Sequence, residues 1–162
     1  MKELISLIMT FVIAAVFNIY PPTYEPLYKD TDHIEGNNND RFKQFPKILM
    51  DISGAQHRND ALVLLGDNTM NGQFIEHSFL FMQLKLFCNA RNILEAMGNH
   101  EIFTAENGYD RGSAKFKFFA GLLAGKKLDK TYYSKVINGY SFIVLGSEAD
   151  KGIQAYISPE QL

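Results

Sequence analysis

Two short apolar runs, each followed at once by a glycine and polar residues, constrain this chain most strongly. Residues 61–65 read ALVLL and precede GDNTMNG, and residues 93–97 read ILEAM and precede GNHE. Residues 73–91, between the runs, have helical character. Continuous apolar runs are typical of parallel strands buried on both faces. The order therefore predicts two neighbouring parallel strands that bring both polar motifs to one sheet edge, where open α/β sheets bind their ligands.

Further segments extend this pattern along the chain. Apolar residues recur at helical spacing over residues 42–53, and residues 114–123 also predict a helix. Residues 131–136 and 140–145 are rich in β-forming residues, and the segment between them contains Asn-Gly, the strongest short hairpin signal. The sequence therefore predicts an α/β fold that begins with parallel strands and becomes antiparallel near its carboxyl end.

The first twenty residues form a separate segment. Residues 4–19 are almost entirely apolar, which fits a signal peptide or a short membrane anchor better than a full membrane span. The alternative is a buried first strand or helix of the domain. We expect an extracellular or membrane-associated protein, with membrane association through residues 4–19, and a cytoplasmic protein is the alternative. The predicted organisation is a signal peptide or anchor at 1–20, a linker at 21–29 and one α/β domain at 30–162.

The charge balance argues against one class of partner. The chain has 16 basic and 18 acidic residues and a net charge of −2, so nothing in it signals nucleic-acid binding. Cys88 is the only cysteine, which excludes an intrachain disulfide framework. At 162 residues and 46% hydrophobic composition, the chain is long enough to bury the core of a single domain.

The two motifs place Asp67 beside an Asn99-His100 pair at the predicted sheet edge. Carboxylate, amide and imidazole groups together can hold a divalent metal and move a proton. Glu101 and Asn71 are expected to hold the loops and not to bind metal. A nucleotide-binding module is a weaker interpretation, because the glycines of residues 66–72 lack the lysine of a phosphate-binding loop.

The motifs GDNTMNG and GNHE, in this order, resemble the second and third motifs of the calcineurin-like metallophosphoesterase family. Residues 140–150, YSFIVLGSEAD, resemble a later strand of the same family, and the resemblance covers residues 28–162. It implies an α/β fold built as a metallophosphoesterase-like sandwich of mixed β-sheets flanked by helices. This chain corresponds to the amino-terminal portion of that fold, so we expect it to be truncated at the carboxyl terminus.

The resemblance also implies a metal-dependent phosphoester hydrolase with two divalent ions, which could be manganese, iron or zinc. Asp67 would bridge the two ions, Asn99 would bind the second, and His100 would act as general acid or stabilise the transition state. A hydroxide between the ions would attack phosphorus in line with the leaving oxygen. The substrate would be a small-molecule phosphoester or a phosphoprotein.

Two features depart from the family pattern. The first motif, Asp-x-His, has only an approximate counterpart in DTDH at residues 30–33, where Asp30, Asp32 and His33 are the candidate metal ligands. The later histidine motifs are not within residues 1–162, and His57 and His77 are expected to be surface residues and no substitutes for them. The alternative hypothesis is therefore a catalytically inactive, truncated fragment that acts at most as a binding domain.

Overall fold

A pair of parallel strands forms the centre of the fold in the computed structural model, which describes residues 45–51, 53, 59–102, 108–148 and 156–162. Strands β1 (Ala61–Leu64) and β2 (Asn92–Glu95) pair in parallel, with Leu62 opposite Ile93. Helix α2 (Phe74–Phe87) connects them. The predicted strand–helix–strand unit is therefore confirmed. Each strand ends before its apolar run does, so the last apolar residues of each run lead into the motif loop.

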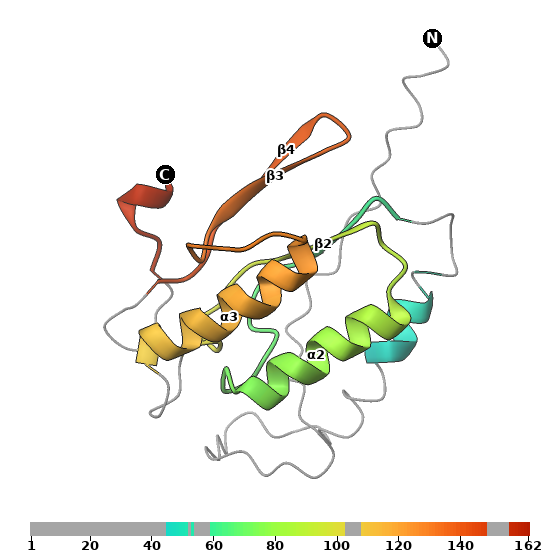
Figure 1. Ribbon diagram of the computed structural model, residues 1–162, viewed down its shortest axis with the longest axis horizontal. Helices are drawn as coiled ribbons and strands as arrows, with labels where there is room; N and C mark the ends of the chain where they lie inside the picture. The colour runs from blue at the N-terminus through green and yellow to red at the C-terminus, as the bar shows by residue number, and fades with distance from the viewer. Residues whose placement is uncertain (1–44, 52, 54–58, 103–107, 149–155) are drawn as a thin grey trace.

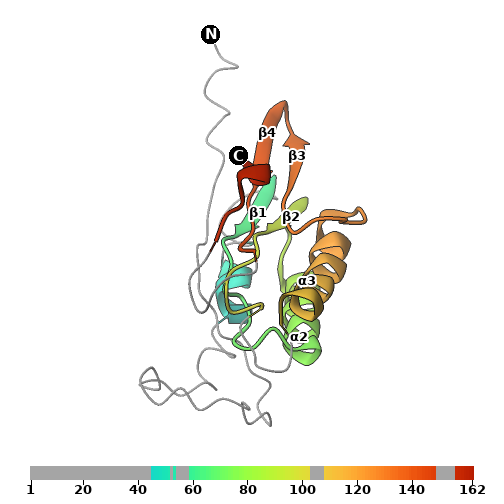
Figure 2. The same cartoon turned by 90° about the vertical axis from the view of Figure 1, so that its left-hand side faces the viewer.

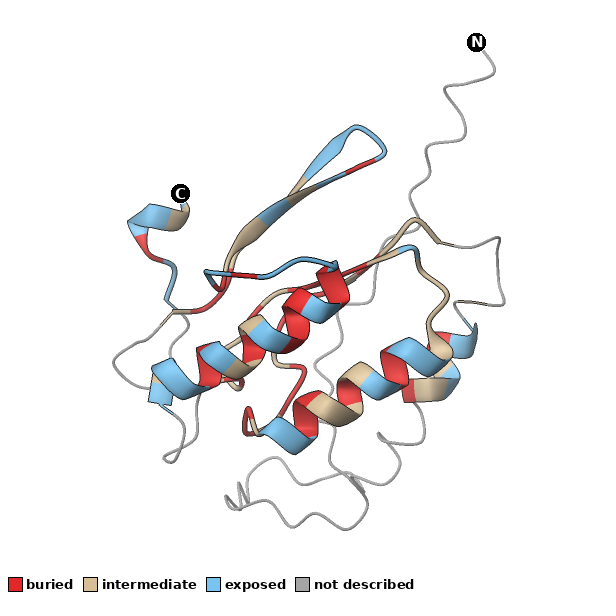
Figure 3. Cartoon of the chain, in the orientation of Figure 1, coloured by how far each residue is buried: buried red, intermediate tan, exposed pale blue. Residues whose placement is uncertain are grey.

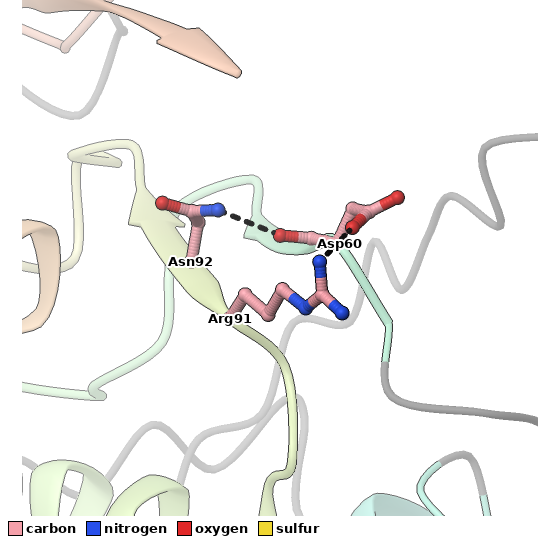
Figure 4. Close-up of polar contacts among 3 residues, drawn as sticks. All are labelled: Asp60, Arg91 and Asn92. Atoms are coloured by element: carbon pink, nitrogen blue, oxygen red, sulfur yellow. Dashed lines mark hydrogen bonds and ion pairs between the residues drawn. The ribbon is translucent and has the colours of Figure 1, made fainter. Parts of the chain in front are cut away.

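The amino-terminal ends of the two strands are joined by polar contacts. Arg91 forms an ion pair with Asp60 at 3.6 Å, and the side-chain amide of Asn92 donates to the backbone carbonyl of Asp60 at 2.8 Å (Figure 4). The ion pair is solvent-exposed and so contributes little stability. The hydrogen bond from the Asn92 side chain links the first residue of β2 to the residue preceding β1, which favours the observed strand register.

Helices α2 and α3 (Gly108–Ala124) lie side by side against the sheet (Figures 1 and 2). Phe119 of α3 joins them, because its ring lies 5.1 Å from Phe74 and 6.1 Å from Phe81. Helix α3 begins six residues earlier than the predicted helix over 114–123, and it ends before Gly125, whose φ of +72° is left-handed. Residues 45–51 form a further helix, within the predicted 42–53.

The two faces of the sheet bury different partners. Leu62, Leu64 and Ile93 pack against α2 and the helix over 45–51 in one core cluster. On the other face, Leu94 packs against Ile137 and Val144. The alternation follows from the strand period of two, which sends neighbouring side chains to opposite faces.

Ile137 and Val144 belong to an antiparallel hairpin. Strands β3 (Tyr133–Ile137) and β4 (Tyr140–Val144) pair across Asn138 and Gly139, whose φ values of 51° and 84° are both positive. Two positive φ values are the signature of a type I′ turn, so the predicted Asn-Gly hairpin is confirmed.

The α/β class is confirmed, and the described residues contain two separate two-stranded sheets. Three expectations stay predictions: the sandwich of mixed β-sheets flanked by helices, the carboxyl-terminal truncation, and the division into segments 1–20, 21–29 and 30–162. The amino-terminal segment and the linker lie outside the described residues. Among the described residues, no helix has both the length and the hydropathy that a membrane crossing requires.

A matched pair of leucines on α2 tests the assignment of the core. Leu84 is 0% exposed and Leu86 is 67% exposed. We expect Leu84→Ala to lower the free energy of unfolding by about 2–5 kcal/mol, because it leaves a cavity between helix and sheet. Leu86→Ala should change it by less than about 0.5 kcal/mol. Urea denaturation measures both, and equal losses would contradict the packing described here.

Candidate functional site

The two motif loops lie against each other at the carboxyl ends of β1 and β2, as predicted. Gly66 has a φ of +98°, and a Cβ on it would lie 2.9 Å from the backbone nitrogen of Gly98. A Cβ on Gly98 would lie 2.1 Å from Asp67 Oδ1. Both distances are too short for any side chain, so the motif glycines allow the loops to approach backbone to backbone.

Asp67 has a left-handed backbone, with a φ of 52°. Such a conformation is uncommon for a residue other than glycine and persists only where the surroundings enforce it. Its backbone N–H donates to Glu101 at 3.0 Å, and its Oδ1 accepts from the backbone N–H of His100 at 3.1 Å. No donor among the described residues reaches its second carboxylate oxygen, Oδ2. Asp67 as a whole is half-buried.

The imidazole of His100 is oriented by the opposite loop. Its Nδ1 lies 2.9 Å from the backbone carbonyl of Met70. A carbonyl can only accept, so Nδ1 is the donor in this hydrogen bond and carries a proton. Asn99 precedes it in a turn closed by a bond from the backbone N–H of Ile102 to the Asn99 carbonyl at 3.1 Å. Asn99 and His100 are both half-buried.

The carboxylate of Glu101 joins the two loops. Its Oε2 accepts from the backbone N–H groups of Asp67 at 3.0 Å and of Gly98 at 2.7 Å. Its Oε1 accepts from the backbone N–H of Thr69 at 2.9 Å and from the Thr69 hydroxyl at 3.1 Å. The side chain is completely buried, and burial raises its pKa, while the backbone donors oppose that shift. The expected structural role of Glu101 is confirmed.

Two more buried carboxylates surround this network, and the sequence analysis missed both. Glu76 Oε2 accepts from the backbone N–H groups of Asn71 at 3.1 Å and Gln73 at 2.9 Å. Burial raises the pKa of Glu76 from 4.5 to about 7. Glu95, at the end of β2, is reached by the side chain of Asn68 at 3.5 Å, and burial raises its pKa well above 4.5. The spacing of Gln73 and Glu76 is that of a capping box, which could have identified Glu76.

His77 is buried, so the expectation of a solvent-facing histidine is wrong. It is 1% exposed, and its ring stacks on Phe119 with centroids 5.5 Å apart and an interplanar angle of 9°. Burial lowers the pKa of His77 to about 3, so the ring is neutral. The reason is that α2 has apolar residues on most of its sides, and its periodicity could not show which side faces α3.

The structure brings together three of the predicted site residues, Asp67, Asn99 and His100, through the contacts between their loops. Within the described part of the chain, no group of three or more histidine, cysteine, aspartate or glutamate residues is arranged to hold a metal. The predicted ligands of the first motif, Asp30, Asp32 and His33, lie outside the described residues. His57 lies outside them as well.

Comparison with known proteins adds one finding to this geometry. Residues 31–157 match the family model described as "Calcineurin-like phosphoesterase". The match spans both motif loops and begins within the first motif, so it includes Asp32 and His33 but not Asp30. The chain matches none of the curated proteins.

The link between the loops can be tested at Glu101. We expect Glu101→Gln to lower the free energy of unfolding by at least about 2 kcal/mol, because the amide NH₂ would face backbone donors that then lose their acceptor. Glu160→Gln is the matched control, since Glu160 is exposed on the 3-10 turn η1 (Pro159–Gln161). Urea denaturation of both variants makes the comparison, and equal stability would contradict the role of Glu101.

The raised pKa of Glu76 predicts a pH dependence of stability. The folded state holds this proton to about pH 7, whereas the unfolded state releases it near 4.5. The free energy of unfolding should therefore fall as pH rises through this window and level off above it. In Glu76→Gln, which keeps one acceptor oxygen, the decrease in the free energy of unfolding that Glu76 causes should disappear. Denaturation curves from pH 4 to 8 measure the free energy of unfolding of both proteins, and parallel pH profiles of wild type and variant would refute the prediction.

Proposed function

The chain belongs to the calcineurin-like phosphoesterase family, and on this premise we propose that it is a metal-dependent phosphoester hydrolase. The family supports phosphoester hydrolysis in general. The observation that carries the proposal for this chain is the hydrogen bond from the His100 backbone to Asp67 Oδ1 at 3.1 Å. That bond places an anionic oxygen and an imidazole, one from each motif, at the same edge of the sheet.

The residues present fit divalent metal ions. Asp67 offers an oxygen, Oδ2, to which no described residue donates a hydrogen bond, and Asn99 can add a neutral oxygen without further charge. We propose that these two residues hold two divalent ions together with His33 and either Asp30 or Asp32. Carboxylate, amide and imidazole donors suit manganese, iron and zinc. When bound, such ions activate water and neutralise the phosphoryl oxygens.

His100 is the proposed general acid. The Met70 carbonyl fixes the ring by accepting from Nδ1, so Nε2 is the atom that would deliver a proton to the leaving oxygen. The Asp67 carboxylate, bonded to the His100 backbone, keeps the ring beside the metal-binding edge. Glu101 contributes indirectly, since it fixes the backbone of the loop that carries Asp67.

The proposed substrates are small-molecule phosphoesters or phosphoproteins. The net charge of −2 gives no support for a nucleic-acid substrate. We also propose an extracellular or membrane-associated location, which the apolar residues 4–19 support.

A non-catalytic binding domain is the second candidate. It is favoured by the sequence DTDH at residues 30–33, in which the position two before His33 is Thr31 and not an acid. A domain with an altered first motif would keep the fold and at most a weakened metal site.

The role of His100 is tested with two substrates that differ in leaving group. With manganese present, we expect His100→Ala to lower turnover of phenyl phosphate by about 10²–10⁴-fold. The loss should be smaller for p-nitrophenyl phosphate, whose leaving group needs less protonation. Bound manganese should stay near the wild-type level, whereas Asp67→Asn should lower both metal content and turnover.

Three outcomes decide between the candidates. Equal losses on both substrates would refute the acid role of His100. Unchanged turnover in His100→Ala would remove His100 from the site. A wild-type chain that binds manganese but hydrolyses neither ester would favour the non-catalytic domain.

A further inference from the structure

The outward side of the helical layer carries exposed apolar side chains. Ile75, Met82 and Leu86 are spaced by seven and four residues, so they follow one side of α2, and they are 42%, 44% and 67% exposed. On α3, Phe118 and Leu122 are four residues apart and are 55% and 46% exposed. Figure 3 shows exposed and buried stretches alternating along both helices. Adjacent apolar residues of this size on a surface indicate a binding face.

A groove runs along the carboxyl-terminal half of α3. It has a volume of about 630 Å³ and lies between the helix and residues 125–129. Three of its lining residues are large and apolar and three are basic: Phe118, Leu122 and Leu128, and Lys117, Lys126 and Lys127. Asp129 also lines the groove and pairs with Lys127, so the basic residues outnumber the acidic one. Apolar side chains together with an excess of basic ones suit a ligand that is apolar and negatively charged.

The same layer is basic although the chain as a whole is acidic. Helices α2 and α3 and residues 125–130 carry seven basic residues: Lys85, Arg111, Lys115, Lys117, Lys126, Lys127 and Lys130. Their only acids are Glu76, which is completely buried, Asp110 in the first turn of α3, and Asp129, which lies 3.8 Å from Lys127. Seven basic residues against three acidic ones give these segments a positive charge, whereas the whole chain carries −2.

We propose that this helical layer, which we call the basic-apolar face, binds the surface of an anionic lipid bilayer. Surface-binding helices typically place large apolar side chains in the headgroup boundary with lysines around them. Each lysine near such a surface adds attraction to anionic headgroups. The side chain of Lys127 is 91% exposed and is accessible to such headgroups. The ammonium of Lys126 donates to the Ser134 carbonyl at 2.8 Å and lies 5.2 Å from the centre of the Tyr133 ring.

A vesicle experiment tests this face in the full chain. We expect cosedimentation with phosphatidylcholine vesicles that contain about one third phosphatidylserine, and much weaker binding to phosphatidylcholine alone. High salt should release the protein, because it screens surface charge. The comparison separates this face from residues 4–19, since an apolar anchor enters both kinds of vesicle.

Two double variants locate the contact. Lys126→Glu with Lys127→Glu, and Phe118→Ser with Leu122→Ser, should each lower the affinity for anionic vesicles by roughly tenfold or more. The matched control is Val136→Ser with Ile143→Ser, which removes side chains that are 66% and 73% exposed on the β3–β4 hairpin. The control should bind like wild type. Thermal unfolding of each variant confirms that the exposed substitutions leave the fold intact.

The proposal is overturned if both vesicle types bind equally, or if the control loses as much affinity as the two test variants. It is also overturned if no vesicles bind while the test variants abolish self-association in solution. That result would assign the face to a second copy of the chain.

Discussion

The carboxylate of Glu101 is the interaction on which the candidate site depends. Burying a charged group is costly unless hydrogen bonds replace its water, and four donors from both motif loops do so here. In return, the carboxylate fixes the loop after β1 against the loop after β2. The left-handed backbone of Asp67 is held by one of these bonds, and Asp67 in turn accepts from the His100 backbone. The positions of the Asp67 carboxylate and of the His100 backbone are thus coupled through Glu101.

The surrounding scaffold carries a cost for this arrangement. Glu76 and Glu95 are buried beside the loops, and burial raises both of their pKa values. Acids whose pKa values burial raises reduce the free energy of unfolding near neutral pH, because their charged form is less favourable in the folded state than in the unfolded one. The core clusters on the two faces of the sheet offset the cost, with Leu84 and Leu94 fully buried. The parallel pairing of β1 and β2 brings the two loops to the same edge of the sheet.

Much of this arrangement follows from local sequence signals. The two apolar runs fix the parallel pair, because such runs are buried on both faces, and Asn138-Gly139 fixes the hairpin through its positive φ values. The early start of α3 was missed because GYDRGS at residues 108–113 has two glycines and no apolar period. The buried His77 was missed because α2 is apolar on most of its sides. The predicted meeting of the Asp67 loop and the Asn99-His100 loop at one sheet edge is confirmed. The roles of all the candidate site residues stay predictions, and Asp30, Asp32 and His33 also lie outside the described part of the chain.

The central claim is that the two loops, held by Glu101, form part of a metal-dependent phosphoesterase site. The most direct test is the metal content of the purified full chain, measured by mass spectrometry after incubation with manganese and removal of the excess. The proposal predicts about two ions per wild-type chain and a clear loss in Asp67→Asn. A wild-type content near zero would contradict it, because the residues brought together at this edge would then not form a metal site.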